Sequence, residues 1–194
     1  MTVIHPVVMP VSTFDQGLAG KEKVAHLSIL ARQALSCSAD ISGVVLDRLD
    51  KDERGAPLPF EGSHWSVSHK NTYVAGVVAP APVGIDIEKI RPCSEALFQK
   101  TGTDEEWGLS GNPKNDHLFF RYWTAKEAVL KTTGAGFRDF SDCRIIRIVD
   151  EHHLALFYRD REWLVSHCFF DDHVSAVVKE AWDIRWEIRD SAEC

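Results

Sequence analysis

Two carboxylates lie two residues apart at the end of an apolar segment, in the sequence Val-Gly-Ile-Asp-Ile-Glu at residues 83–88. Such a segment is typical of a buried strand, on which side chains at i and i+2 point to the same face. We therefore expect Asp86 and Glu88 to project together from a strand. Solvated acids at a strand end are the simpler interpretation of this pair taken alone.

A second charged pair lies in Trp-Thr-Ala-Lys-Glu-Ala-Val-Leu-Lys at residues 123–131. The pattern predicts a helix on which Glu127 and Lys131 share a face, either as a surface ion pair or as functional groups. With Asp86 and Glu88, Glu127 would complete a hard oxygen site of the kind that Mg²⁺ uses together with substrate phosphates. A neighbouring lysine is a natural phosphate anchor. Together these residue types indicate phosphoryl transfer.

The elements that must position these residues repeat along the chain. Trp-Ser-Val-Ser-His at 65–69 recurs as Trp-Leu-Val-Ser-His at 163–167, and apolar strands follow at 74–78 and 174–178. This spacing predicts that the second connection is two residues longer than the first. A chance match is possible in principle, but its agreement with the predicted strands favours an internal duplication.

The duplication predicts an α+β fold with pseudo-two-fold symmetry, in which each half is a long helix packed on a small antiparallel sheet. Apolar stripes predict the helices at about 21–35 and 119–133. We place the N-terminal half at residues 1–88 and the C-terminal half at 89–194, which ends in a strand over 182–194. The site is expected at the interface of the halves, where clefts commonly form.

Three segments in this order resemble the signature of the 4′-phosphopantetheinyl transferase superfamily, in its surfactin-type branch, whose members carry two half-domains in one chain. They are Trp-Ser-Val-Ser-His-Lys at 65–70, Gly-Ile-Asp-Ile-Glu at 84–88 and the predicted helix at 123–131. Weaker similarity extends over about 21–180. Each motif alone is of moderate specificity, whereas the ordered set is highly specific.

The resemblance implies Mg²⁺-dependent transfer of 4′-phosphopantetheine from coenzyme A, the co-substrate, to a serine of an acyl or peptidyl carrier protein, releasing 3′,5′-ADP. It implies that Asp86, Glu88 and Glu127 bind the metal, and that His69 and Lys131 contact the coenzyme A phosphates. The catalytic residues implied are Asp86, Glu127 and Lys131, with Glu127 helping to deprotonate the serine hydroxyl. For His69, the alternative is a structural histidine at a strand end.

Two positions depart from the family pattern. Ala56 stands where relatives usually carry a lysine, and Leu27 where many carry an arginine. Both departures weaken recognition of the 3′-phosphate end, since a charge-assisted hydrogen bond is worth roughly 1.5–3 kcal/mol. The cations that could compensate are Lys21, Lys23, Arg48 and Arg54. The alternative function is a catalytically weak relative that binds coenzyme A or carrier domains, and an unrelated Mg²⁺ phosphohydrolase ranks last because it leaves His69 unexplained.

Composition narrows the class of protein further. The formal charge of −7 argues against general nucleic-acid binding. No apolar run is long enough to span a membrane, and the N-terminus lacks a signal-peptide pattern. The five cysteines are scattered and lack C-x-x-C spacing, which favours a reducing compartment. We expect a cytoplasmic protein without nucleic-acid or membrane partners, and a monomer because one chain carries both halves.

Carrier docking is expected on the segment 89–100, where Leu97 and Phe98 lie between Arg91 and Lys100. Apolar and basic side chains there would complement an acidic amphipathic helix of the carrier. An ordinary packed connector is an equally good interpretation of this segment.

Overall fold

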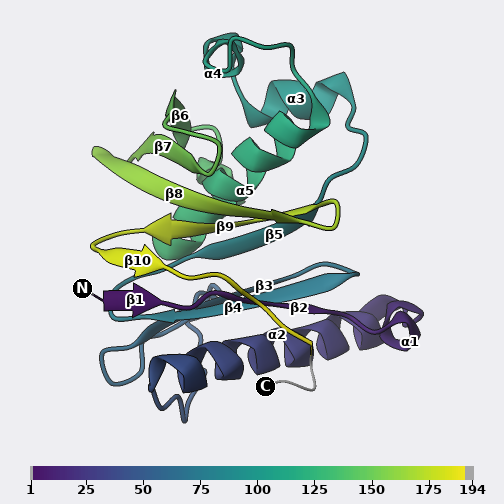
Figure 1. The fold of residues 1–194 in the computed structure, drawn as a ribbon, viewed down its shortest axis with the longest axis vertical. Coiled ribbons are helices and arrows are strands. Elements are labelled where there is room, and N and C mark those ends of the chain that lie inside the picture. The colour runs from purple at the N-terminus through teal and green to yellow at the C-terminus, as the bar shows by residue number, and fades with distance from the viewer. Residues whose placement is uncertain (1, 191–194) are drawn as a thin grey trace.

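The computed structural model describes residues 2–190 of the chain. The elements are β1 (Thr2–Ile4), β2 (Val7–Pro10), α1 (Thr13–Gln16), α2 (Gly20–Ser42), β3 (His64–His69), β4 (Tyr73–Ala79), β5 (Ile85–Lys89), α3 (Glu95–Thr101), α4 (Asp104–Gly108), α5 (Asp116–Thr132), the 3-10 helix η1 (Phe137–Asp139), β6 (Arg144–Ile148), β7 (His153–Tyr158), β8 (Arg161–Phe170), β9 (His173–Lys179), β10 (Trp182–Ile184) and β11 (Glu187–Ile188). They form four layers: α2, the sheet β11-β2-β4-β3, the sheet β5-β9-β8-β7-β6, and α5 (Figure 1). The α+β class predicted from the sequence is confirmed.

The alternation of side chains along β4 separates two layers of core. Val74 packs with Leu27 of α2, whereas Ala75 on the opposite face packs in the cluster between the two sheets. Gly76 allows the close approach of strand and helix, since a Cβ there would lie 2.4 Å from the backbone nitrogen of Leu35. A glycine is required at this contact because backbone atoms cannot rotate out of the way.

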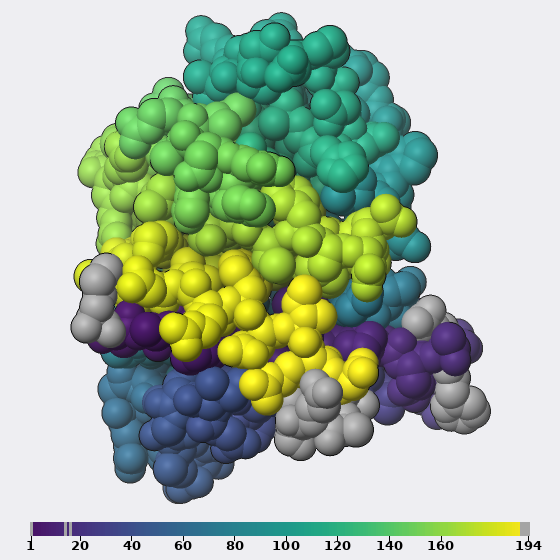
Figure 2. Space-filling view, viewed as in Figure 1, coloured from purple at the N-terminus to yellow at the C-terminus, as the bar shows by residue number. Residues whose placement is uncertain are grey.

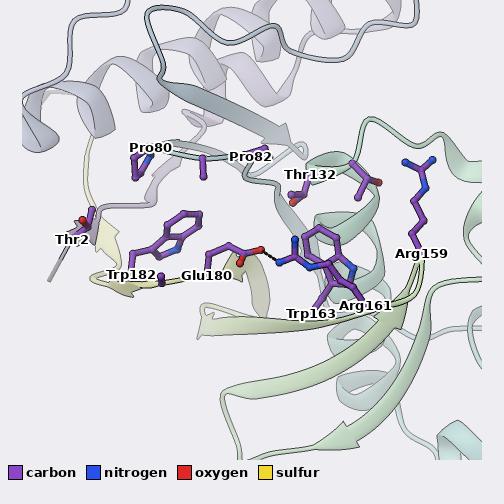
Figure 3. A pocket seen from close by; sticks show the side chains of 12 residues that line it. Thr2, Pro80, Pro82, Thr132, Arg159, Arg161, Trp163, Glu180 and Trp182 are labelled. Atoms are coloured by element: carbon purple, nitrogen blue, oxygen red, sulfur yellow. Dashed lines mark hydrogen bonds and ion pairs between the residues drawn. The ribbon is translucent and has the colours of Figure 1, made fainter.

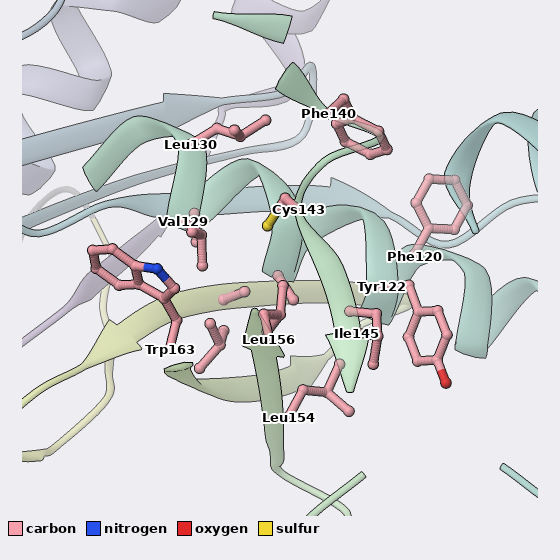
Figure 4. Packing of buried hydrophobic residues seen from close by; sticks show 14 of the residues in the cluster. Phe120, Tyr122, Val129, Leu130, Phe140, Cys143, Ile145, Leu154, Leu156 and Trp163 are labelled. Carbon is pink, nitrogen blue, oxygen red and sulfur yellow. The ribbon is translucent and has the colours of Figure 1, made fainter. Parts of the chain in front are cut away.

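The largest core cluster lies between α5 and the five-stranded sheet. Figure 4 shows Tyr122 and Val129 of the helix packing toward Leu154 and Leu156 of β7, and all four side chains are at most 2% exposed. The strands of this sheet are antiparallel throughout. This packing fixes the face that α5 presents to β5.

The first two strands of the chain pair with its last two strands. β1 pairs in parallel with β10, and β2 pairs in parallel with β11. Figure 2 shows the C-terminal segment (yellow) between the purple N-terminal strands and the green part of the five-stranded sheet. β5, which runs across the expected boundary at residue 88, pairs with β9 and so belongs to the five-stranded sheet. The division into residues 1–88 and 89–194 stays a prediction.

Both predicted helices are present, with different bounds. α2 continues to Ser42, beyond the predicted end at Leu35, and stops at Gly43, which has a left-handed φ of 66°. α5 begins at Asp116, where Asn115 accepts a hydrogen bond from the backbone N–H of Leu118. The predicted terminal strand is two short strands, β10 and β11, and its last four residues lie outside the described part of the chain.

The two repeated hairpins have turns of equal length. Residues 71–72 form the turn of β3–β4, and residues 171–172 form the turn of β8–β9. The prediction of a longer second connection is therefore wrong. The repeated sequence is displaced by two residues along its strand, which keeps each side chain on the same face. The pseudo-two-fold relation itself stays a prediction.

Among the cysteines, Cys93, Cys143 and Cys168 are free thiols, whereas Cys37 is not. Cys194 lies outside the described residues. Within residues 2–190, none of the helices combines the length and apolar character needed to cross a membrane.

Candidate active site

The two acids of β5 point to one face of the strand, toward α5. Asp86 is 4% exposed and Glu88 is 8% exposed, whereas Ile85 and Ile87 pack on the opposite face between the two sheets. The period of two along a strand accounts for this division. The expectation that the two carboxylates project together therefore holds, and solvated acids do not describe them.

Helix α5 brings Lys131 against this face. Its Nζ donates hydrogen bonds to Oδ1 of Asp86 at 2.8 Å and to the backbone carbonyl of Ile85 at 3.0 Å. The hydroxyl of Ser68 on β3 donates to the same Oδ1 at 2.8 Å. Three elements therefore converge on Asp86. Ser68 belongs to the motif at 65–70, but its bond to Asp86 joins residues 18 apart and could not be predicted from spacing.

A second lysine pairs with the other acid of β5. Nζ of Lys70 lies 2.7 Å from Oε1 of Glu88. Lys131 bonds to Asp86, and no ion pair joins it to Glu127 within the residues described. The simple helix-surface pair considered from the sequence is therefore not formed.

The carboxylates are close enough to affect one another's ionisation. Burial raises the pKa of Glu127, and the charges of Asp86 and Glu88 raise it further, while Lys131 and Lys70 oppose the shift. Burial and then the charge of Asp86 likewise raise the pKa of Glu88, against the opposing effect of Lys70. This mutual repulsion is the electrostatic condition that a bound cation would relieve.

The donor set fits a hard cation in its chemistry, although the side chains are not gathered as a finished metal site. Within residues 2–190, no group of three or more His, Cys, Asp or Glu side chains is arranged to hold a metal ion. Lys70 and Lys131 neutralise the two acids of β5 instead. Oδ2 of Asp86 is buried and has no hydrogen-bond partner among the described residues. A buried carboxylate oxygen without a donor is a place where a cation would be stabilised.

A basic cavity of about 320 Å³ opens beside these residues. Its lining residues are Lys51, Arg54, Gly55, Ala56, Pro57, Ser66, Val67, Lys131, Gly134, Ala135 and Gly136. His69 lies in the same electrostatic environment, because burial lowers its pKa and the charges of Lys131, Lys70 and Lys51 lower it further. A neutral imidazole surrounded by ammonium groups is suited to donate to an anion, and the cations are suited to neutralise it.

The positions that depart from the family pattern differ in their surroundings. Ala56 lines the basic cavity, whereas Leu27 is 4% exposed and packs in the core of α2. Of the cations proposed to compensate, Arg54 lines the cavity. Lys51 also lines it. It was not predicted from the sequence, although it lies only three residues before Arg54 on the same loop.

Lys126, next to Glu127 in sequence, points to the other side of the helix. It is 1% exposed, and its Nζ lies 2.8 Å from Oε1 of Glu106 on α4. Glu106 also accepts hydrogen bonds from the backbone N–H groups of Thr103 and Ile145, both at 2.8 Å. Lys126 thus ties α5 to α4 and β6 and does not reach the acids of β5.

The segment proposed for carrier docking is packed. Phe98 is 7% exposed, with ring centroids 5.3 Å from Trp107 and 5.1 Å from Phe119. Leu97 packs partly buried against the same core cluster. The docking prediction is wrong for Phe98, because its side chain is buried in the core cluster around α5. The packed connector is the correct interpretation there.

Comparison with known proteins places this chain in a family of transferases. Residues 82–181 match the family model described as the 4′-phosphopantetheinyl transferase superfamily. The match covers more than half of the chain, including β5 and α5. The chain belongs to the 4′-phosphopantetheinyl transferase superfamily.

Individual relatives agree with this assignment. The chain is 29% identical over 150 residues to 4′-phosphopantetheinyl transferase ffp of Bacillus subtilis, covering 70% of this chain and 64% of that protein. It is 41% identical over 76 residues to psf-1 of Bacillus pumilus, covering 38% and 33%. It is 30% identical over 115 residues to Sfp of Bacillus subtilis strain 168, covering 56% and 48%. The matches thus span a third to two thirds of these relatives, and the resemblance to the surfactin-type branch is confirmed.

Proposed function

We propose that this protein transfers 4′-phosphopantetheine from coenzyme A to a serine of an acyl or peptidyl carrier protein in a Mg²⁺-dependent reaction. The observation that carries the proposal is the contact of Lys131 with Asp86. It brings the acid strand, the helix that bears Glu127 and the basic cavity to one place. The named relatives are 4′-phosphopantetheinyl transferases, which supports the same activity here.

Coenzyme A binding is assigned to the basic cavity and its edge. Lys51 and Arg54 face the nucleotide end and supply the positive charge that Ala56 and Leu27 cannot provide. Lys131 and His69 contact the pyrophosphate, where charge-assisted hydrogen bonds are strongest. The cavity of about 320 Å³ is at the lower end of the range for small-molecule sites, so much of the co-substrate extends beyond it.

The three carboxylates are assigned to the metal. Asp86, Glu88 and Glu127 would hold Mg²⁺, with the unpartnered Oδ2 of Asp86 as one ligand atom. Bound Mg²⁺ neutralises charge on the phosphoryl group and on the departing phosphate. Lys70 must release Glu88 for that carboxylate to turn to the metal, because its ammonium group now occupies Oε1.

In the chemical step, the serine Oγ of the carrier forms a bond to the β-phosphorus of coenzyme A. The bond from that phosphorus to the bridging oxygen breaks, and 3′,5′-ADP leaves. Glu127 accepts the serine proton, directly or through water, and Lys131 stabilises the leaving phosphate. A catalytically weak relative that only binds coenzyme A or carrier domains is the second candidate, favoured by Ala56 in the wall of the cavity.

We also infer that the two halves are related by a pseudo-two-fold axis, with a boundary near residue 88. The equal two-residue turns of β3–β4 and β8–β9 support this relation. Every residue assigned above comes from one chain, so we propose that the monomer is active.

The test is intact-mass analysis of a panel of apo carrier proteins after incubation with the protein, coenzyme A and Mg²⁺. We expect a phosphopantetheine-sized mass gain that disappears with EDTA and falls at least about 100-fold in rate in Asp86→Asn. Asp183→Asn, an exposed residue of β10, is the matched control. No gain on any carrier, with coenzyme A binding intact, would instead establish the binding relative.

A further inference from the structure

A second cavity, of about 860 Å³, lies on the other flank of α5. Its lining residues are Ser110, Asn112, Asn115, His117, Leu118, Arg121, Ile148, Glu151, His152 and Phe169. None of them belongs to the acids or to the basic cavity described above. In the five-stranded sheet, β9 lies between the acid strand β5 and β8, which carries Phe169, so two strand spacings, roughly 10 Å, separate Phe169 from Glu88.

One wall of this cavity contains a buried cation that has no counter-ion among residues 2–190. Arg121 is 9% exposed, and its Nη2 donates to the backbone carbonyls of Asp150 and of His153, the latter at 3.1 Å. Its Nε is buried and has no hydrogen-bond partner in the described part of the chain. No carboxylate within the described residues forms an ion pair with it, because Oδ1 of Asp150 accepts from the backbone N–H groups of His152 and His153. A desolvated cation in this state is unfavourable unless an anion joins it.

In another cavity of the molecule, the arginines are paired with acids. It has a volume of about 640 Å³ and lies at the opposite end of α5, with Arg159 and Arg161 in its wall (Figure 3). Arg161 is ion-paired with Glu180, as the dashed line in the figure marks, and Arg159 lies 3.6 Å from Asp139. Both arginines of that cavity are paired with carboxylates of the protein. Arg121, by contrast, forms no ion pair with any described residue.

The rest of the cavity around Arg121 has the polarity of a site for an organic anion. The first turn of the 17-residue helix α5 opens on its rim, where the positive end of the helix dipole favours negative charge. The side chains of Asn112, His117 and His152 add donors at the rim. Leu118 and Phe169, with Ile148, form an apolar wall.

Two acids oppose an anion there. The carboxylate of Asp116, in the first turn of α5, accepts a hydrogen bond from the backbone N–H of Cys93. Glu151 lines the cavity, and its side chain is exposed. Its charge weakens the attraction that Arg121 exerts on a ligand, which supplies a test.

We propose that this cavity binds a small ligand that carries an oxyanion, either a carboxylate or a phosphate, on an apolar body. The oxyanion is the missing counter-ion of Arg121 at the start of α5, and the apolar body rests on Leu118, Ile148 and Phe169. This site is separate from coenzyme A and does not depend on the transferase function proposed above.

The test is a titration of the full, isotopically labelled chain with benzoate and with phenyl phosphate, followed by NMR. The Nε–H signal of Arg121 is assigned by its absence in Arg121→Gln. We expect this signal and the backbone amides of Glu151 and Phe169 to shift and saturate, beyond any effect of sodium chloride at the same ionic strength. Saturation by only one of the two probes identifies its oxyanion as the one bound.

Variants separate the site from the basic cavity and from general charge effects. Glu151→Gln should tighten binding about twofold or more, because it removes a like charge from the rim. Glu22→Gln, on the distant helix α2, makes the same charge change and should leave the affinity unchanged. Shifts confined to the amides of Gly134 and Gly136, or no tightening in Glu151→Gln, would overturn the proposal. Glu151→Gln keeps this test valid if Arg121→Gln does not fold.

Discussion

At the scale of single residues, the decisive groups are charges removed from water. Asp86 and Glu88 are held by lysines from two different elements, and Lys126 and Glu106 form a pair that is almost fully buried. Such pairs specify an arrangement more than they stabilise it, because desolvation offsets most of the attraction. Removing the lysine is costly in each case, since a buried carboxylate remains.

Replacing Lys126 with methionine should lower the free energy of unfolding by about 3–5 kcal/mol, because Glu106 would stay buried without its cation. Urea unfolding followed by circular dichroism measures this change. The matched control is Lys114→Met, whose exposed contact with Asp104 at 3.2 Å should contribute less than about 1 kcal/mol. Equal losses in the two variants would contradict the proposed cost of the buried pair.

His167 makes stability depend on pH. Burial, together with the nearby charge of Arg121, lowers its pKa to about 3 in the folded protein, against an ordinary value of 6.5. The unfolded chain therefore binds a proton below pH 6.5 that the folded chain does not bind. From about pH 7.5 to about pH 5 this difference should remove about 2 kcal/mol of stability.

The measurement compares urea unfolding at about pH 7.5 and about pH 5 in the parent and in His167→Gln. The variant should lose less stability on acidification by that amount, whatever its stability at the higher pH. His152→Gln, an exposed histidine that contacts the ring of Phe169, should behave like the parent. An unchanged pH dependence in His167→Gln would show that the folded protein admits a proton at this position.

At the scale of elements, the site depends on how closely α5 approaches β5. Gly84 makes this approach possible, because a Cβ there would lie 2.0 Å from the backbone carbonyl oxygen of Ala128 and 2.7 Å from the backbone nitrogen of Thr132. Gly76 allows an equally close approach of β4 to α2. In both layers a glycine sets the distance between strand and helix.

Gly84→Ala should therefore destabilise the protein by more than about 3 kcal/mol or separate β5 from α5, since backbone atoms cannot move aside cheaply. Loss of the contact between Asp86 and Lys131 should accompany it, measured as weaker coenzyme A binding in whatever folded protein remains. Gly108→Ala is the control, because a Cβ there meets nothing within 4 Å. A Gly84 variant with normal stability and binding would show that the two elements have room to separate.

At the scale of the whole molecule, net charge and local charge have opposite signs. The chain carries −7, yet the lining of the basic cavity includes three cations, Lys51, Arg54 and Lys131, and no acid among the described residues. Local cations dominate the binding of a nearby anion, because charges further away than about 10 Å are screened at 0.1 M salt. The sign of the salt effect distinguishes the two contributions.

Coenzyme A affinity should fall roughly threefold or more between about 50 and about 300 mM sodium chloride, measured by calorimetry. Repulsion by the net charge would instead make binding tighter as salt rises. Lys51→Ala should reduce both the affinity and its salt dependence, whereas Lys21→Ala on α2 should change neither. Equal effects of the two variants would remove Lys51 from the proposed site.

The sequence by itself determined the α+β class, the two long helices, and which charged residues share a face on each predicted element. These follow from local periodicity, because a strand places Asp86 and Glu88 on one face and a helix places Glu127 and Lys131 on one face. The ordered motifs also predicted the family, which the comparison confirmed. Local spacing could not predict that Phe98 is buried or that the two hairpin turns are equal in length.

Only the tertiary structure decided which partners these residues have. Lys131 bonds to Asp86 across 45 residues of sequence, Lys126 pairs with Glu106, and Lys51 joins the basic cavity through a loop. On the far flank of α5, Arg121 forms no ion pair with a carboxylate of residues 2–190. Such contacts join elements that are distant in the chain, so they depend on how layers pack rather than on periodicity. The energy of a buried charge is set by these neighbours, and for that reason the chemistry of the site was decided by the fold.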